Sequence, residues 1–110
     1  MNKEESNRIE MLKEYLKDDP DDTFSNYALA LEFMKLNETE HAVEILEKIL
    51  KMDEHYLATY YQLGKVYEKA ARIEDAKTVY QKGIEIAIQQ KNQRTRNELQ
   101  SAFDSMGEDD

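Results

Sequence analysis

The sequence predicts an all-α protein, built as a stack of antiparallel helix–turn–helix repeats with about six helices. The chain of 110 residues has only 3 Gly and 1 Pro, and runs of β-branched residues are scarce, so helices are favoured over strands. In addition, a shift of 34 positions superimposes one stretch of the sequence on another. The shift aligns Leu29 with Leu63, Phe33 with Tyr67, Ala42 with Ala76 and Leu46 with Tyr80. A fixed period in this range indicates stacked supersecondary units.

The first predicted helix covers about residues 3–17, where apolar residues recur at spacings of three and four along one face. Pro20 ends this region, because proline lacks a backbone donor and disfavours helical dihedrals at the residue before it. Asp21 or Asp22 then offers a side-chain oxygen that can cap the next helix.

The second and third helices are predicted at about residues 23–36 and 39–52. Apolar residues occur on more than one side of the second helix, so we expect it to lie between two neighbours. Asn37 suits the left-handed position after a helix, and Thr39 suits the capping position of the helix that follows.

The fourth and fifth helices are predicted at about residues 57–70 and 73–89. A polar and basic interval follows. Thr95 and Glu98 have the spacing of a capping box, so we expect the last helix to start at Thr95. A repeat stack exposes an apolar face at each terminus, and the first and last helices are the natural covers of those faces.

We therefore expect one domain over residues 1–110. Its predicted parts are an N-terminal helix with its proline turn (3–20), a first repeat (23–56), a second repeat (57–90) and a C-terminal capping helix (95–106).

Seven residues of the second helix pair form one pattern. They are Tyr60, Leu63, Gly64 and Tyr67 on its first helix, and Ala76, Tyr80 and Gly83 on its second helix. This succession of an aromatic residue, Leu-Gly, Tyr, Ala, an aromatic residue and a small residue resembles the tetratricopeptide repeat. The resemblance implies a right-handed superhelix in which these residues form the structural repeat core.

The first helix pair matches the same pattern more loosely. Its matching residues are Leu29, Ala30, Phe33, Ala42 and Leu46, which the resemblance also places in the core. Asn26 replaces the first aromatic residue, and Ile49 replaces a small one. The proline expected after each pair is absent there but occurs before the first pair, as Pro20. The opening helix thus resembles the second half of an earlier repeat.

Catalytic and metal chemistry have little support in the sequence. There is no Cys, and the only two histidines, His41 and His55, do not have metal-ligand spacing. The acidic run at residues 18–22 lacks the central Gly and distal Glu of a calcium loop, so we interpret it as helix capping. We expect no catalytic residue, no metal site and no cofactor.

The net charge of -9 argues against nucleic acid or an anionic membrane as the main partner. The basic interval at residues 91–96 is small, and we interpret it as a solvated loop or a helix terminus whose charge complements the helix dipole. The opening residues contain no apolar stretch of signal-peptide length. A cytoplasmic location is therefore the expectation.

The candidate binding residues follow from the resemblance, which implies a concave groove lined by the first helix of each pair. They are Phe24, Tyr27, Leu31, Tyr61, Lys65, Glu68 and Lys69. Accessible aromatic side chains such as Tyr27 and Tyr61 make good anchors for a partner. Chaperone-binding members of the family clamp a peptide carboxylate with Lys and Asn, but the corresponding positions here hold other residues, among them Leu31 and Gln62.

These observations predict a non-enzymatic adaptor that presents a groove to a protein partner, either a peptide or a single helix. The alternative is a structural module that associates with itself, because a short stack with an uncovered apolar end can pair with a second copy. The two alternatives stay open at the level of the sequence.

Overall fold

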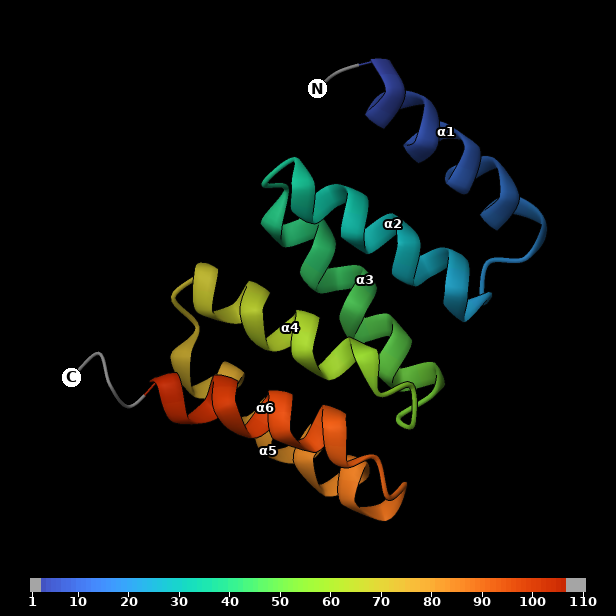
Figure 1. Ribbon diagram of the computed structural model, residues 1–110. Helices are drawn as coiled ribbons and strands as arrows, with labels where there is room; N and C mark the ends of the chain where they lie inside the picture. The colour runs from blue at the N-terminus through green and yellow to red at the C-terminus, as the bar shows by residue number, and fades with distance from the viewer. Residues whose placement is uncertain (1–2, 107–110) are drawn as a thin grey trace. The chain divides into compact units, whose positions relative to one another are not determined.

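The computed structural model describes residues 3–106, with the side chain of Glu5 left out. Within that range the chain forms six α-helices and no strand (Figure 1). The helices are α1 (Lys3–Asp18), α2 (Thr23–Lys35), α3 (Thr39–Met52), α4 (Ala58–Lys69), α5 (Ile73–Gln89) and α6 (Gln93–Met106). The prediction of an all-α helical repeat stack is confirmed.

The contacts divide the chain into two compact units, with the boundary between Glu54 and His55. In the first unit α2 packs against both α1 and α3, as the apolar residues on several of its sides predict. In the second unit α5 packs against α4 and α6, and α6 also contacts α4 (Figure 1). The second unit is therefore a three-helix arrangement in which every helix touches the other two.

The turn between α1 and α2 is held by side-chain hydrogen bonds. Asp22 caps α2, because its Oδ2 accepts a hydrogen bond of 2.8 Å from the Ser25 amide. Hydrogen bonding to the Ser25 side chain, and secondly to the Ser25 amide, lowers the pKa of the Asp22 carboxyl below its ordinary value. Asn26, which is buried, donates from Nδ2 to the carbonyl oxygens of Pro20 at 3.0 Å and Asp22 at 2.9 Å. The predicted cap at this turn is confirmed.

One predicted helix cap and one predicted helix start are wrong. Helix α3 covers Thr39–Met52, as predicted, but its capping position is held by Glu38, which forms no side-chain hydrogen bond to the helix, and not by Thr39. Helix α6 begins at Gln93 rather than Thr95, because Asn92 Oδ1 accepts the hydrogen bond of the Thr95 amide at 3.0 Å. Thr95 therefore lies inside the first turn of α6.

Three helix ends share one turn geometry. Asn37, Ala71 and Lys91 have left-handed backbone angles, with φ of 59°, 61° and 58°. After α2, the Asn37 amide donates to the Met34 carbonyl and the next amide donates to the Phe33 carbonyl, and the other two ends repeat this Schellman pattern. Asn37 fits its prediction. A residue such as Ala or Lys at this position carries a conformational penalty of about 1 kcal/mol or more.

The residues assigned to the repeat core are placed as follows. Eleven are buried: Leu29, Ala30, Ala42, Leu46, Tyr60, Leu63, Gly64, Tyr67, Ala76, Tyr80 and Gly83. Phe33 is half-buried; its ring stacks on His41 with centroids 5.0 Å apart, and the ammonium of Lys13 lies 5.8 Å from its centre. Phe33 therefore packs at the edge of the first unit.

Helices α4 and α5 approach so closely that Gly64 leaves no room for a larger residue. A Cβ atom built on Gly64 would overlap the ring of Tyr80, which is fully buried. In the first unit, 34 residues earlier, the equivalent positions hold Ala30 and Leu46. The second repeat thus combines the smaller Gly64 with the larger Tyr80, whereas the first repeat combines Ala30 with Leu46. The two repeats fill equivalent helix crossings but divide the side-chain volume differently between the two helices.

A second crossing in the same unit follows the same rule. A Cβ atom on Gly83 would lie 2.6 Å from Cβ of Tyr60 and 2.9 Å from Cδ1 of Leu99. The equivalent positions of the first unit hold Ile49 and Asn26, so the first repeat has a larger residue on its second helix and a smaller one on its first helix. Asn26 and Ile49, the two departures of the first repeat from the family pattern, therefore compensate each other in size: Asn26 is smaller than the expected aromatic residue, and Ile49 is larger than the expected small one.

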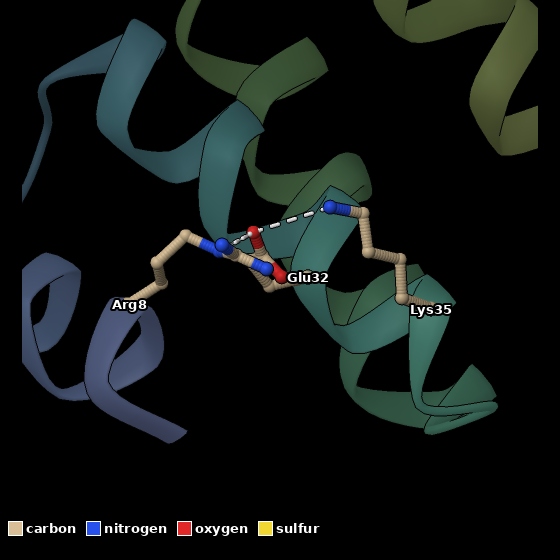
Figure 2. A network of polar contacts seen from close by, with 3 residues as sticks. All are labelled: Arg8, Glu32 and Lys35. Carbon is tan, nitrogen blue, oxygen red and sulfur yellow. Dashed lines mark hydrogen bonds and ion pairs between the residues drawn. The ribbon is translucent and has the colours of Figure 1, made fainter. Parts of the chain in front are cut away.

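A partly buried ion pair holds α1 against α2 (Figure 2). Arg8 Nε donates to Glu32 Oε1 at 2.8 Å, and Lys35 Nζ lies 3.5 Å from the same oxygen. The Glu32 side chain is only 10% exposed. Because an unpaired buried carboxylate is strongly destabilising, Arg8 fixes how α1 lies on α2.

Candidate functional site

A groove of about 640 Å³ lies between α4 and α6 in the second unit. Helix α4 contributes Tyr61, Gln62 and Lys65, and α6 contributes Asn97, Glu98, Ser101, Ala102 and Ser105. The groove exists because α6 packs on α5 through buried Leu99 and also contacts α4. Most of the lining side chains carry amide, hydroxyl or charged groups, so the groove can exchange hydrogen bonds with a bound chain.

Tyr61 and Lys65 form an amphipathic platform on the α4 side of this groove. The Lys65 ammonium lies 5.5 Å from the centre of the Tyr61 ring, a distance at which a cation is attracted to an aromatic face. Both residues are half-buried. The platform offers a flat apolar surface next to a positive charge.

Glu68 connects this platform to the protein core. Tyr80 donates its hydroxyl hydrogen bond to Glu68 Oε2 at 2.5 Å, and Lys65 Nζ lies 3.8 Å from the same oxygen. Burial raises the pKa of the Tyr80 hydroxyl well above the ordinary value of 10.0, and the hydrogen bond to Glu68 raises it further. Tyr80 therefore stays neutral and remains a donor at neutral pH.

The predicted groove residues fall into two sets. Phe24, Tyr27 and Leu31 lie on α2 in the first unit, where Phe24 is 72% exposed and the other two are half-buried. Tyr61 and Lys65 line the groove of the second unit. Glu68 and Lys69 do not line that groove: Glu68 binds Tyr80, and Lys69 is exposed in the last turn of α4.

Sequence reasoning missed the contribution of α6. Asn97, Ser101 and Ser105 are small polar residues spaced four apart, which places them on one stripe of the helix. The stripe is a visible signal in the sequence. Its meaning depends on the contact of α6 with α4, which the spacing alone does not give.

Two other kinds of site are not seen in residues 3–106. No three His, Asp or Glu side chains in this range gather as they would around a metal ion. None of the helices described is both long enough and apolar enough to cross a membrane.

The helix pairs, their common turn geometry and the groove define a small helical repeat protein of the kind that presents a surface to other proteins. The family model for the tetratricopeptide repeat matches residues 33–95, which is more than half of the chain. The protein belongs to the tetratricopeptide repeat family. The comparison with curated proteins finds no match.

Two similar solved structures are of a tetratricopeptide repeat domain protein from Salinibacter ruber. Its solution NMR structure is 41% identical, with a TM-score of 0.73, and the match covers 77% of this chain and 86% of that one. Its crystal structure is 40% identical, with a TM-score of 0.71, and the match covers 74% and 91% of the two chains.

A third similar structure is the TPR2B domain of yeast Sti1 in a complex with pHsp70. Its TM-score is 0.88, and the match covers 97% of this chain and 86% of that one. At 14% identity this likeness concerns the fold alone.

The raised pKa of Tyr80 predicts a specific loss of stability in alkali. A group whose pKa is higher in the folded state stabilises the fold fully below its unfolded pKa, and this contribution falls as the pH rises above that value. We expect the Tyr80→Phe variant to be about 1 kcal/mol less stable near neutral pH, because it loses one hydrogen bond. Between about pH 9 and about pH 12 its melting temperature should fall less steeply than that of the wild type.

Thermal unfolding followed by circular dichroism measures both slopes. The Tyr15→Phe variant is the control, because Tyr15 is exposed on α1 and should leave the wild-type slope unchanged. Equal slopes for Tyr80→Phe and the wild type would contradict the assignment of a buried, neutral hydroxyl.

Proposed function

We propose that this protein is a non-enzymatic interaction module whose second unit holds an extended segment of a partner protein between α4 and α6. The observation that carries the proposal is the open groove of about 640 Å³ with polar side chains from both helices. Membership of the tetratricopeptide repeat family, whose members generally act as scaffolds for other proteins, supports it. The proposal includes a cytoplasmic location and excludes nucleic acid and membranes as main partners.

The spacing of the α6 stripe suits an extended chain better than a helix. Asn97, Ser101 and Ser105 succeed one another at four-residue intervals, which corresponds to about 6 Å along a helix axis. Alternate residues of an extended chain are separated by about 6.6 Å. In an extended peptide the backbone amides of alternate residues lie on the same edge. The polar side chains of Asn97, Ser101 and Ser105 can therefore each meet one of these amides.

The α4 side of the groove supplies the anchor. An apolar side chain of the ligand can lie on the Tyr61 ring, while a neighbouring carbonyl or carboxylate oxygen meets the Lys65 ammonium. The hydrogen bond between Tyr80 and Glu68 holds the carboxylate that pairs with Lys65. The platform is thus preorganised before the ligand binds, which favours affinity.

A random peptide library displayed on phage tests this function directly. We expect selected peptides to shift the amide NMR signals of residues 61–65 on α4 and of residues 97–105 on α6. The Tyr61→Ala variant should bind them at least about tenfold more weakly, because it removes a central aromatic anchor. Ile73→Ala is the control, since Ile73 is an exposed large apolar residue at the start of α5 that does not line the groove. Selected peptides that bind Tyr61→Ala as tightly as the wild type would rule the groove out.

Self-association is the second candidate function. Met11 and Tyr15 lie four residues apart on α1 and are 71% and 55% exposed, and Phe24 at the start of α2 is 72% exposed. Large apolar side chains at this exposure favour burial against another surface. When the chain is aligned with the family's repeat pattern, α1 takes the place of the second helix of a helix pair. A second copy of the chain can cover the exposed face of α1.

Light scattering over a range of concentrations tests self-association. If two copies pair through α1, the mean mass should rise with concentration, and Met11→Lys should abolish the rise because it places a charge in the contact. A mass equal to that of one chain at every concentration would remove this candidate and leave the groove function unaffected.

A further inference from the structure

A second, smaller pocket lies at the turn between α5 and α6. Its volume is about 340 Å³, and it is lined by Ala87, Ile88, Lys91, Asn92, Gln93 and Arg96. None of these residues lines the groove between α4 and α6. Ile88 is 55% exposed although it is a large apolar residue. The pocket thus combines an accessible apolar floor with two basic side chains.

The charge around this pocket is opposite to that of the rest of the chain. Between Glu85 and Glu98 the sequence contains three basic residues and no acidic one, whereas the whole chain has 24 acidic and 15 basic residues. Arg94 forms an ion pair with Glu98 at 3.4 Å. No ion pair to Lys91 or Arg96 occurs within the part of the chain that the structure describes. These two cations are therefore available to an external anion.

Helix stability does not explain this concentration of positive charge. Arg94 and Arg96 lie in the first turn of α6, at the positive end of the helix dipole, where cations are unfavourable. The interpretation of the basic interval as a terminus that complements the dipole is therefore wrong for these two residues. Lys91 has a left-handed backbone conformation that Gly or Asn adopts more readily. Both Lys91 and Arg96 occupy positions where another residue would stabilise the fold better.

We propose that the pocket at the α5–α6 turn binds an acidic linear segment of a partner protein, with an apolar side chain against Ile88 and carboxylates at Lys91 and Arg96. Charge complementarity selects this ligand, because Arg and Lys bind carboxylates through charge-assisted hydrogen bonds. The apolar floor provides no aromatic face for stacking with a base, and the chain as a whole repels a nucleic acid through its net charge of -9. This site is separate from the groove and does not depend on the groove function.

The test uses the acetylated and amidated peptide Asp-Glu-Leu-Asp-Glu, added to isotope-labelled protein up to about 5 mM, a range suited to millimolar affinity. We expect the amide signals of residues 88–96 to shift, and the affinity to fall several-fold between about 50 mM and about 200 mM salt. The uncharged peptide Asn-Gln-Leu-Asn-Gln should produce no shift in these residues.

Two variants separate binding from stability. Lys91→Gly relieves the left-handed backbone, and Arg96→Glu places an anion at the start of α6, so both should keep or raise the melting temperature. Each should weaken binding about threefold, and the double variant about tenfold. Ala71→Gly is the control for the backbone effect, because it relieves the same left-handed conformation at the equivalent turn after α4 without removing a charge, and it should leave peptide binding unchanged.

Three results would overturn the proposal. The first is the absence of shifts in residues 88–96 at the highest peptide concentration, or shifts that persist in the double variant. The second is a DNA duplex of about 12 base pairs that binds these residues more tightly than the peptide at equal salt, which would point to a nucleic acid. The third is a set of the same shifts produced by concentrating the protein alone, which would point to an acidic segment of a second copy.

Discussion

The close approach of α4 and α5 at Gly64 is the constraint on which the second unit depends. The absence of a side chain on Gly64 lets the ring of Tyr80 occupy the crossing between the two helices. A glycine inside a helix costs about 1 kcal/mol relative to alanine, so its packing role must outweigh that penalty. The same logic holds where Gly83 faces Tyr60. In the first unit Ala30 and Leu46 occupy the positions of Gly64 and Tyr80.

The position of Tyr80 also organises the candidate groove. Its buried hydroxyl reaches Glu68, Glu68 pairs with Lys65, and Lys65 lies over Tyr61. A residue without a hydroxyl at this position, such as Leu46 in the first repeat, cannot form this connection. The larger aromatic residue therefore contributes to the core and to the binding platform, which links the packing of the second repeat to its proposed function.

The sequence was sufficient for those features that depend on local chemistry or on the repeat period. The six helices follow from periodicity and from the scarcity of Gly and Pro, and Asp22 and Asn37 have side chains with known preferences for their positions. Ala71 and Lys91 adopt the same left-handed conformation as Asn37, but their side chains give no local signal of it. The start of α6 was mistaken because the Thr-Glu spacing of a capping box also fits the interior of a helix.

The candidate site was less predictable than the fold for a physical reason. Tyr61 and Lys65 could be identified from the repeat position that they occupy, but Asn97 and Ser101 become site residues only through the tertiary contact between α6 and α4. Glu68 shares the expected face of α4, yet a hydrogen bond from the core engages it. Contacts between helices, rather than helical periodicity, decide which polar residues a ligand can reach.

A double-mutant cycle between Gly64 and Tyr80 tests the central constraint most directly, with the free energy of unfolding measured by chemical denaturation. Gly64→Ala alone should destabilise the protein by about 1–3 kcal/mol through overpacking against the Tyr80 ring. In a Tyr80→Leu background, which recreates the Ala30 and Leu46 combination, the same change should be neutral or stabilising. The account predicts a coupling energy of at least about 1 kcal/mol between the two positions. An equal effect of Gly64→Ala in both backgrounds would contradict it.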